Sequence, residues 1–173
     1  MKLYRAKIPV IAKATIERLV ADGDIELQPG AREEAERDLI AIMEEYSRRD
    51  NELRDRCRDL MASHNIPYSE FGRTRKRLAD EMGHPLGDDV ERFLVRQFIE
   101  NLMISPHIVE VYGEDDKLIY RKVMEILKSN DVDEGDIRQE ALSRMKNVQE
   151  GTVEYELALQ EQMRQVRKRR GLT

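Results

Sequence analysis

Apolar residues recur at three- and four-residue steps along most of the chain, which is the spacing of one face of an α-helix. This pattern predicts a first helix over residues 9–21, with Gly23 just beyond its end. The longest signal covers residues 31–62 and resembles a heptad seam that is interrupted once, at Asp50. The apolar positions of this seam are Leu39, Met43, Tyr46, Leu53, Cys57 and Leu60.

The pattern then predicts shorter helices separated by turn residues. A third helix covers residues 68–82, because Gly83 follows it. Asp88 or Asp89 is placed to cap a fourth helix, which ends before Pro106.

The last third of the chain also reads as helical, with one interruption. A helix carries the apolar residues between 119 and 127, and the pattern resumes over residues 137–148. Asp131 and Glu134 resemble a capping box, so we expect a break or a kink between these two stretches. Gly151 precedes a final helix over residues 153–170.

Two short stretches have the character of extended chain. They are Ile25-Glu26-Leu27 and Ile108-Val109-Glu110-Val111. Neither is long enough to be stable alone, so we expect them to pair as a minimal two-stranded β-ribbon. The predicted fold class is therefore all-α with long amphipathic helices and this ribbon.

The order of elements repeats along the chain. A shift of 83 residues superimposes Ile16, Glu17, Leu19 and Ile25 on Ile99, Glu100, Leu102 and Ile108. A shift of 84 superimposes Arg37, Ile42, Arg54, Met61 and Glu70 on Arg121, Ile126, Arg138, Met145 and Glu154. Both halves run helix, short strand, acidic-start helix, break and basic helix, which favours a duplication. We predict two homologous three-helix repeats, residues 1–84 and 85–173, packed as one body.

Composition narrows the class of protein. The 173 residues include 40% hydrophobic and 38% charged side chains, with a net charge of −5 and no Trp. This is enough apolar material to exclude full disorder. A single cysteine, Cys57, cannot form an internal disulfide or a thiolate cage, which favours a reducing compartment and predicts a cytoplasmic protein. No apolar run is long enough to span a membrane, and Lys13 interrupts the stretch after the basic start, so we expect no signal peptide.

Catalytic and metal-binding patterns are missing from the sequence. There is no Gly-rich phosphate loop, no Ser-His-Asp signature and no defensible carboxylate pair. Glu81 and His84 have the Glu-x-x-His spacing of di-iron bundles, but only once and where a helix ends. We therefore expect no enzymatic activity, cofactor or metal, and we interpret His64, His84 and His107 as surface or capping residues.

Basic clusters are the most informative feature for function. The candidate residues for an anionic partner are Arg73, Arg75, Lys76 and Arg77, then Arg167, Lys168, Arg169 and Arg170, with Lys2, Arg5 and Lys7 as a third group. Such clusters could bind the phosphates of nucleic acid or an acidic protein face. The simpler interpretation, which the pattern favours, is that they are solvated helix ends that complement the helix dipole.

Two residues on the long seam have structural interpretations. Cys57 lies between Arg56 and Arg58, but neighbours at one-residue spacing point to other helix faces, so a buried structural thiol is favoured. Asp50 either fixes the packing register with Arg54, one turn on, or faces water. The second half has Glu134 and Arg138 at the matching places, which favours the structural role.

The two ends of the chain carry familiar motifs. The chain opens with Met1-Lys2-Leu3-Tyr4-Arg5-Ala6-Lys7-Ile8, followed by Ile16-Glu17-Arg18-Leu19, Gly23 and Ile25-Glu26. It closes with Gly151-Thr152-Val153-Glu154-Tyr155, then Gln162-Met163 and Lys168-Arg169-Arg170-Gly171. These segments resemble an uncharacterised bacterial family, domain of unknown function 507. Family members are typically about half this length, so the resemblance implies two fused copies, although Tyr68-Ser69 replaces the closing Gly-[Ser/Thr] pair in the first half.

The resemblance implies no activity, cofactor or catalytic residue. We therefore expect a non-enzymatic helical binding or scaffolding protein that acts through protein–protein contacts or self-assembly, and the apolar seams suit a homodimer. The alternative is a nucleic-acid- or ribosome-associated protein that uses the basic helices. No membrane partner is expected.

Overall fold

The computed structural model describes residues 1–112, 116–145 and 153–172, and it confirms the all-α class with one small ribbon. In chain order the elements are α1 (Ile8–Ala21), β1 (Ile25–Leu27), α2 (Arg32–Ser63), α3 (Phe71–Met82), α4 (Asp89–Ile104), β2 (Ile108–Val111), α5 (Asp116–Ser129), α6 (Glu134–Arg144) and α7 (Val153–Arg169). Short 3₁₀ turns precede α1 and α3, at Arg5–Lys7 and Tyr68–Glu70.

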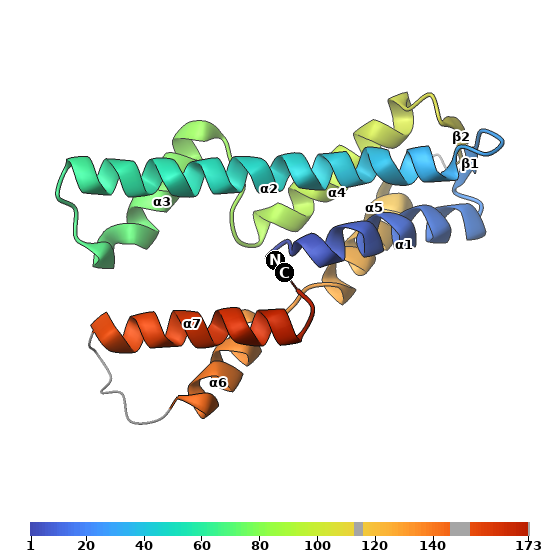
Figure 1. The fold of residues 1–173 in the computed structure, drawn as a ribbon. Coiled ribbons are helices and arrows are strands. Elements are labelled where there is room, and N and C mark those ends of the chain that lie inside the picture. Colours follow the sequence, from blue (N-terminus) through green and yellow to red (C-terminus); the bar gives the residue numbers. More distant parts are fainter. Residues whose placement is uncertain (113–115, 146–152, 173) are drawn as a thin grey trace.

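Helix α2 is the long helix on which several other elements pack (Figure 1). It runs without a break through Asp50 and is about 48 Å long at 1.5 Å per residue. Its buried side chains are Ala35, Leu39, Met43, Tyr46, Leu53, Cys57 and Met61. The face ends on Met61 rather than Leu60, because a helix of 3.6 residues per turn drifts away from a strict heptad. The same helix therefore packs on α1 and α4 along its first half and on α3 along its second.

Four helices enclose the main hydrophobic core. Helix α1 packs against α2 and α5, and α4 packs against α5 and α2. Ile11, Ile16, Leu39, Phe98 and Leu127 are among the fully buried side chains. The main core therefore takes residues from both sides of His84.

The predicted β-ribbon is confirmed. Strands β1 and β2 pair antiparallel, with Ile25 opposite Val111, Glu26 opposite Glu110 and Leu27 opposite Ile108. Backbone bonds extend the pairing at both ends, from Gln28 N–H to His107 C=O (2.9 Å) and from Tyr112 N–H to Asp24 C=O (2.7 Å). The ribbon ties the α1–α2 hairpin to the α4–α5 hairpin.

A second, smaller core joins helices α6 and α7. It consists of Ile137, Ala141, Leu159, Val166 and Leu172, together with Tyr4 from the other end of the chain. Tyr4 is 6% exposed, and Arg167 Nε donates to its hydroxyl at 3.3 Å. Figure 1 shows α6 and α7 set apart from the main body, with both chain ends lying between. The segment before α1 therefore fastens this hairpin to the rest of the molecule.

The caps differ from the sequence-based expectation. The break before α6 is present, but the cap residue is Asp133, whose Oδ1 accepts from Gly135 N–H at 2.7 Å; the prediction of Asp131 was wrong. Asp88 does precede α4, yet its side chain makes no cap hydrogen bond. The break predicted at Gly151 lies outside the described residues.

Candidate functional site

The basic residues of α3 do not form a free cationic surface. Arg73 pairs with Glu70 at 3.0 Å and Arg77 with Glu81 at 3.7 Å. Arg75 turns inward instead and bonds Asp50 of α2. Three of the four predicted cations on this helix are therefore already held by carboxylates.

The basic end of α7 behaves in the same way. Arg167 Nη2 donates to Glu134 Oε2 at 2.7 Å, and Arg170 pairs with Glu140 at 2.7 Å. Lys2 reaches the other oxygen of Glu134 at 3.2 Å. Glu134 therefore links the N-terminal segment to α7.

The remaining predicted residues are Arg5, Lys7, Lys76, Lys168 and Arg169, and the described part of the chain shows no ion pair to any of them. Arg169 donates to Gln165 of its own helix. The structure thus brings together a subset of the predicted residues: Lys2, Arg5 and Arg75 line one cleft, and Arg167 lies beside it through Glu134.

Asp50 organises the first wall of this cleft. Its Oδ2 accepts from Arg54 Nη2 at 3.1 Å, as the sequence predicts, and its Oδ1 accepts from Arg75 of α3. His84 Nε2, from the segment between α3 and α4, lies 3.4 Å from the same Oδ1. Asp50 therefore joins three parts of the chain and does not face open water.

The interpretation of His84 as a surface or capping residue was wrong. Its side chain is 1% exposed, and its ring stacks on Tyr46 with centroids 4.8 Å apart. Burial lowers the pKa of His84, and the Asp50 carboxylate only partly opposes this effect. Tyr46 donates to Pro85 C=O at 3.2 Å, and burial raises the pKa of its phenol. The two rings pack beneath Asp50, where burial disfavours the charged form of each.

Glu134 organises the second wall, with different partners from those expected. Its ion pairs are to Lys2 and Arg167, not to Arg138 one turn on. Burial is the main cause that lowers the pKa of Lys2, and the nearby positive charges of Arg167 and Arg54 act in the same direction. Glu134 opposes the shift without cancelling it.

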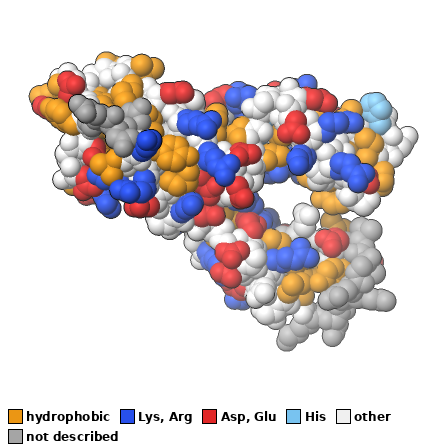
Figure 2. Space-filling view, turned by 180° about the vertical axis from the view of Figure 1, so that it is seen from behind, with side chains coloured by type: hydrophobic (Ala, Val, Ile, Leu, Met, Phe, Trp, Pro, Cys, Tyr) orange, Lys and Arg blue, Asp and Glu red, His pale blue; other side chains and the backbone are white. Residues whose placement is uncertain are grey.

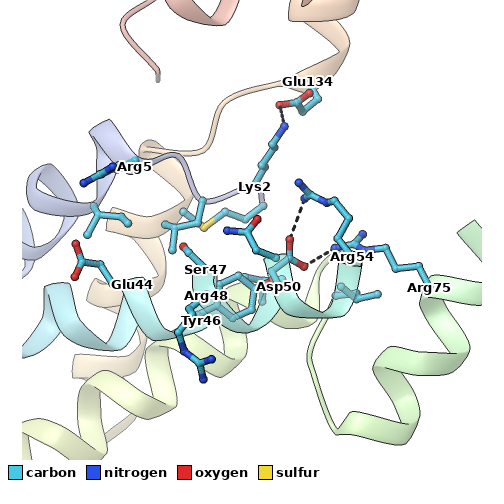
Figure 3. Close-up of a pocket in the computed structure, with 17 residues that line it drawn as sticks. Lys2, Arg5, Glu44, Tyr46, Ser47, Arg48, Asp50, Arg54, Arg75 and Glu134 are labelled. Carbon is cyan, nitrogen blue, oxygen red and sulfur yellow. Dashed lines mark hydrogen bonds and ion pairs between the residues drawn. The ribbon is translucent and has the colours of Figure 1, made fainter. Parts of the chain in front are cut away.

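Between these walls lies a cleft of about 710 Å³. Figure 3 shows Lys2 and Arg54 reaching into it from the N-terminal segment and from α2, with Arg75 entering from α3. Its other charged residues are Arg5, Glu44, Arg48, Asp50 and Glu134. Figure 2 shows the open gap between the α2–α3 arm and the α6–α7 arm, at whose base this cleft lies.

Several residues of the cleft carried little signal in the sequence. Arg48 and Glu44 look like ordinary members of a charged helix face, and Arg48 is also paired with Glu45 at 2.7 Å. The contact between Lys2 and Glu134 joins positions far apart in the sequence, and neither residue predicts it. The sequence did single out Asp50, as an acid on an apolar seam, and it named Lys2, Arg5 and Arg75 as members of basic clusters without indicating that they share one cleft.

The structure also bears on the predictions for Cys57 and His64. Cys57 is fully buried, and burial raises the pKa of its thiol, so the structural interpretation is confirmed. His64 is the C-cap of α2, and its Nδ1 lies 3.1 Å from Leu60 C=O. Within the described residues, no group of His, Cys, Asp and Glu side chains is arranged to hold a metal ion.

Exposed apolar side chains collect at the ribbon end of the molecule. Met103 and Ile104 end helix α4, Val109 lies on β2, and Tyr112 follows it. Ile104 is 81% exposed. Figure 2 shows hydrophobic side chains gathered at this end. We call these four residues the ribbon-end patch.

Comparison with protein families gives a match over nearly the whole chain. A family model described as "Protein of unknown function (DUF507)" matches residues 1–172. No curated protein matches the chain. Among the described helices, none combines the length and the apolar character that crossing a membrane requires.

Proposed function

Because the chain belongs to the DUF507 family, whose function is unknown, we propose a role from its geometry: a non-enzymatic helical binding protein that acts through protein–protein contacts. The contact surface is the ribbon-end patch, and its occupant is a second copy of the chain. The observation that carries the proposal is the clustering of Met103, Ile104, Val109 and Tyr112 on one exposed end. Scattered apolar residues are normal on a surface, whereas several large exposed ones at the same end of a molecule favour an interaction site there.

The total surface of the chain supports a binding role. It exposes 10983 Å², whereas a compact monomer of 20.3 kDa exposes about 8,800 Å². The difference exceeds the roughly 800 Å² that each partner contributes to an ordinary interface. Figure 1 shows the α6–α7 hairpin set apart from the main body, and such an outline exposes more surface than a sphere of the same mass. The molecule therefore has more surface available for contacts than its mass requires.

The ribbon favours a second copy as the occupant. The described sheet has two strands, so each strand is paired on one side only. An unpaired edge is a template for another strand. Two copies related by a two-fold axis can pair their β2 edges and cover each other's Ile104 and Tyr112 at the same time.

Mass measurement by sedimentation or light scattering tests this proposal. We expect the chain to be dimeric at micromolar concentration and Ile104→Asp to be monomeric. Val10→Asp is the matched control, because Val10 is 48% exposed at the far end of α1 from the ribbon, and it should stay dimeric. A wild-type chain that stays monomeric at high concentration, or equal dissociation of both variants, would refute self-association at this surface.

The ion pairs of the basic helices argue against nucleic acid as the main partner. On the outer faces of α3 and α7, Arg73, Arg77 and Arg170 already pair with Glu70, Glu81 and Glu140, with which the phosphates of a nucleic acid would have to compete. Binding to duplex DNA or RNA with a salt slope of several counterions would favour this alternative instead. Cys57, a buried free thiol, supports our proposal of a reducing, cytoplasmic location.

We also infer that the two halves descend from one copied unit. The order α1, β1, α2, α3 is repeated as α4, β2, α5 with α6, and α7. Contacts cross between the halves in matched pairs, α1 with α5 and α2 with α4. Asp50 and Glu134, 84 positions apart, each bind an arginine from the last helix of their half. This pattern supports duplication of a half-length ancestor.

A further inference from the structure

Four cations share two carboxylates at the base of the gap between the arms. Lys2 and Arg167 both bind Glu134, and Arg54 and Arg75 both bind Asp50. Each carboxylate offers one negative charge to two positive ones. The cluster therefore keeps a surplus of two positive charges, although the chain as a whole carries −5.

This surplus has visible consequences in the cluster. Burial is the main cause that lowers the pKa of Lys2, and the positive charges of Arg167 and Arg54 act in the same direction, as expected where cations outnumber carboxylates. Arg75 keeps a buried Nε–H that has no hydrogen-bond partner within the described structure. A buried donor of this kind is costly unless something accepts from it. Glu134 Oε1 is also buried without a hydrogen-bond partner within the described structure, although Lys2 Nζ lies 3.2 Å from it as an ion pair. The polar atoms of the cluster are therefore incompletely paired.

A small molecule can reach two cations of the cluster, Lys2 and Arg54. The side chains of Lys2 and Arg54 are 42% and 39% exposed, and both line the cleft of about 710 Å³. This volume lies in the range of pockets that hold ligands of nucleotide size. Figure 3 shows that the two side chains enter from different walls, so that one anionic group could contact both.

We propose that the cleft binds a phosphate-bearing small molecule, with its phosphate held between Lys2 and Arg54 and neutralised further by Arg75 and Arg167. A phosphate monoester carries up to two negative charges, which matches the surplus of the cluster. Guanidinium groups bond phosphate oxygens in parallel pairs, and an ammonium group adds a point charge. Asp50 and Glu134 do not repel this ligand strongly, because their oxygens are already engaged by the same cations.

The ligand would also connect separate parts of the fold. Lys2 belongs to the N-terminal segment, Arg54 to α2, Arg75 to α3 and Arg167 to α7. A phosphate among them replaces repulsion between these elements with shared attraction. Binding therefore stabilises the position of the α6–α7 arm, and this site is independent of the ribbon-end patch.

Titration calorimetry with inorganic pyrophosphate and with ADP, at constant ionic strength set by chloride, tests the proposal. We expect saturable binding of one ligand per chain and a rise in melting temperature. Arg54→Gln and Lys2→Met should each weaken binding at least tenfold. Arg58→Gln is the matched control, because Arg58 lies one turn further along α2, pairs with exposed Asp55 and is outside the cleft.

Each outcome decides the question. Equal affinity for pyrophosphate and ADP identifies the phosphate itself as the recognised group, and tighter binding of ADP shows that the cleft also contacts the nucleoside. Absence of saturable binding of either probe overturns the proposal, as does equal weakening by Arg58→Gln, which would indicate diffuse charge attraction. If Arg54→Gln melts far below the wild type without ligand, Lys2→Met carries the test, because Lys2 precedes the first helix.

Discussion

Replacement of Tyr4 by Ala should loosen one arm of the molecule and leave the other intact. Tyr4 is the buried aromatic residue through which the N-terminal segment enters the α6–α7 core. Truncation of a buried aromatic side chain to Ala costs about 3–5 kcal/mol, and loss of the half-buried bond from Arg167 adds to this. Since Tyr4 fastens the hairpin to the body, we assign the cost to opening of the hairpin. A loss of about 3 kcal/mol corresponds to roughly a 100-fold rise in the opening equilibrium.

Hydrogen exchange resolved by peptide measures this effect. Amides of α6 and α7 should exchange about 100-fold faster in Tyr4→Ala, while those of α1, α2, α4 and α5 should be unchanged. Tyr68→Ala is the control, because Tyr68 is 70% exposed at the tip of the α2–α3 arm and loses the same atoms. Unchanged exchange in α6 and α7 would refute the fastening role. Equal acceleration throughout the main core would show that the two cores unfold as one unit.

Three further predictions concern buried groups of α2 and of the segments packed on it. Burial lowers the pKa of His84 below its ordinary 6.5, so the unfolded chain binds a proton that the folded chain refuses; the free energy of unfolding should fall as pH drops from about 7 to 5, and His84→Asn should show a shallower slope in urea titrations at each pH. Asp50→Asn leaves Arg75 half-buried without its charge partner and should cost about 3 kcal/mol in urea unfolding, whereas Asp55→Asn on the exposed face should cost under about 0.5 kcal/mol; similar losses for both would contradict the network. Cys57 should react with a thiol reagent only after denaturant is added, and rapid labelling of the native chain would show that the α2–α3 arm opens readily.

The sequence predicts the helices well because their apolar steps are regular and their ends carry Gly or Pro. The apolar seam of α2 follows from its three- and four-residue steps. The pairing of the two short extended pieces could be predicted because neither piece would be stable alone. Asp50 stands out in the sequence because it is a charged residue on an otherwise apolar helix face. Its first partner, Arg54, follows from helical spacing.

The other contacts of the site could not be predicted, because they depend on how the helices are arranged in space. Lys2, Arg75 and Arg167 looked like members of three separate clusters, and nothing local indicates that two carboxylates would gather them. His84 looked like a residue at a helix end, and only the approach of α2 buries it against Tyr46. Tyr4 carried no signal at all, because its partners lie at the opposite end of the chain.

The crossing of the two halves has a consequence for synthesis. The core that contains Ile11 and Ile16 of α1 is complete only when Val123 and Leu127 of α5 have been synthesised. The smaller core around Tyr4 requires Val166 of α7. The hydrophobic helix faces of a nascent chain therefore stay exposed to solvent until more than two thirds of the chain has been translated. Such a polypeptide depends on late closure, and we expect premature termination products to be captured by chaperones or degraded and not to survive as folded fragments.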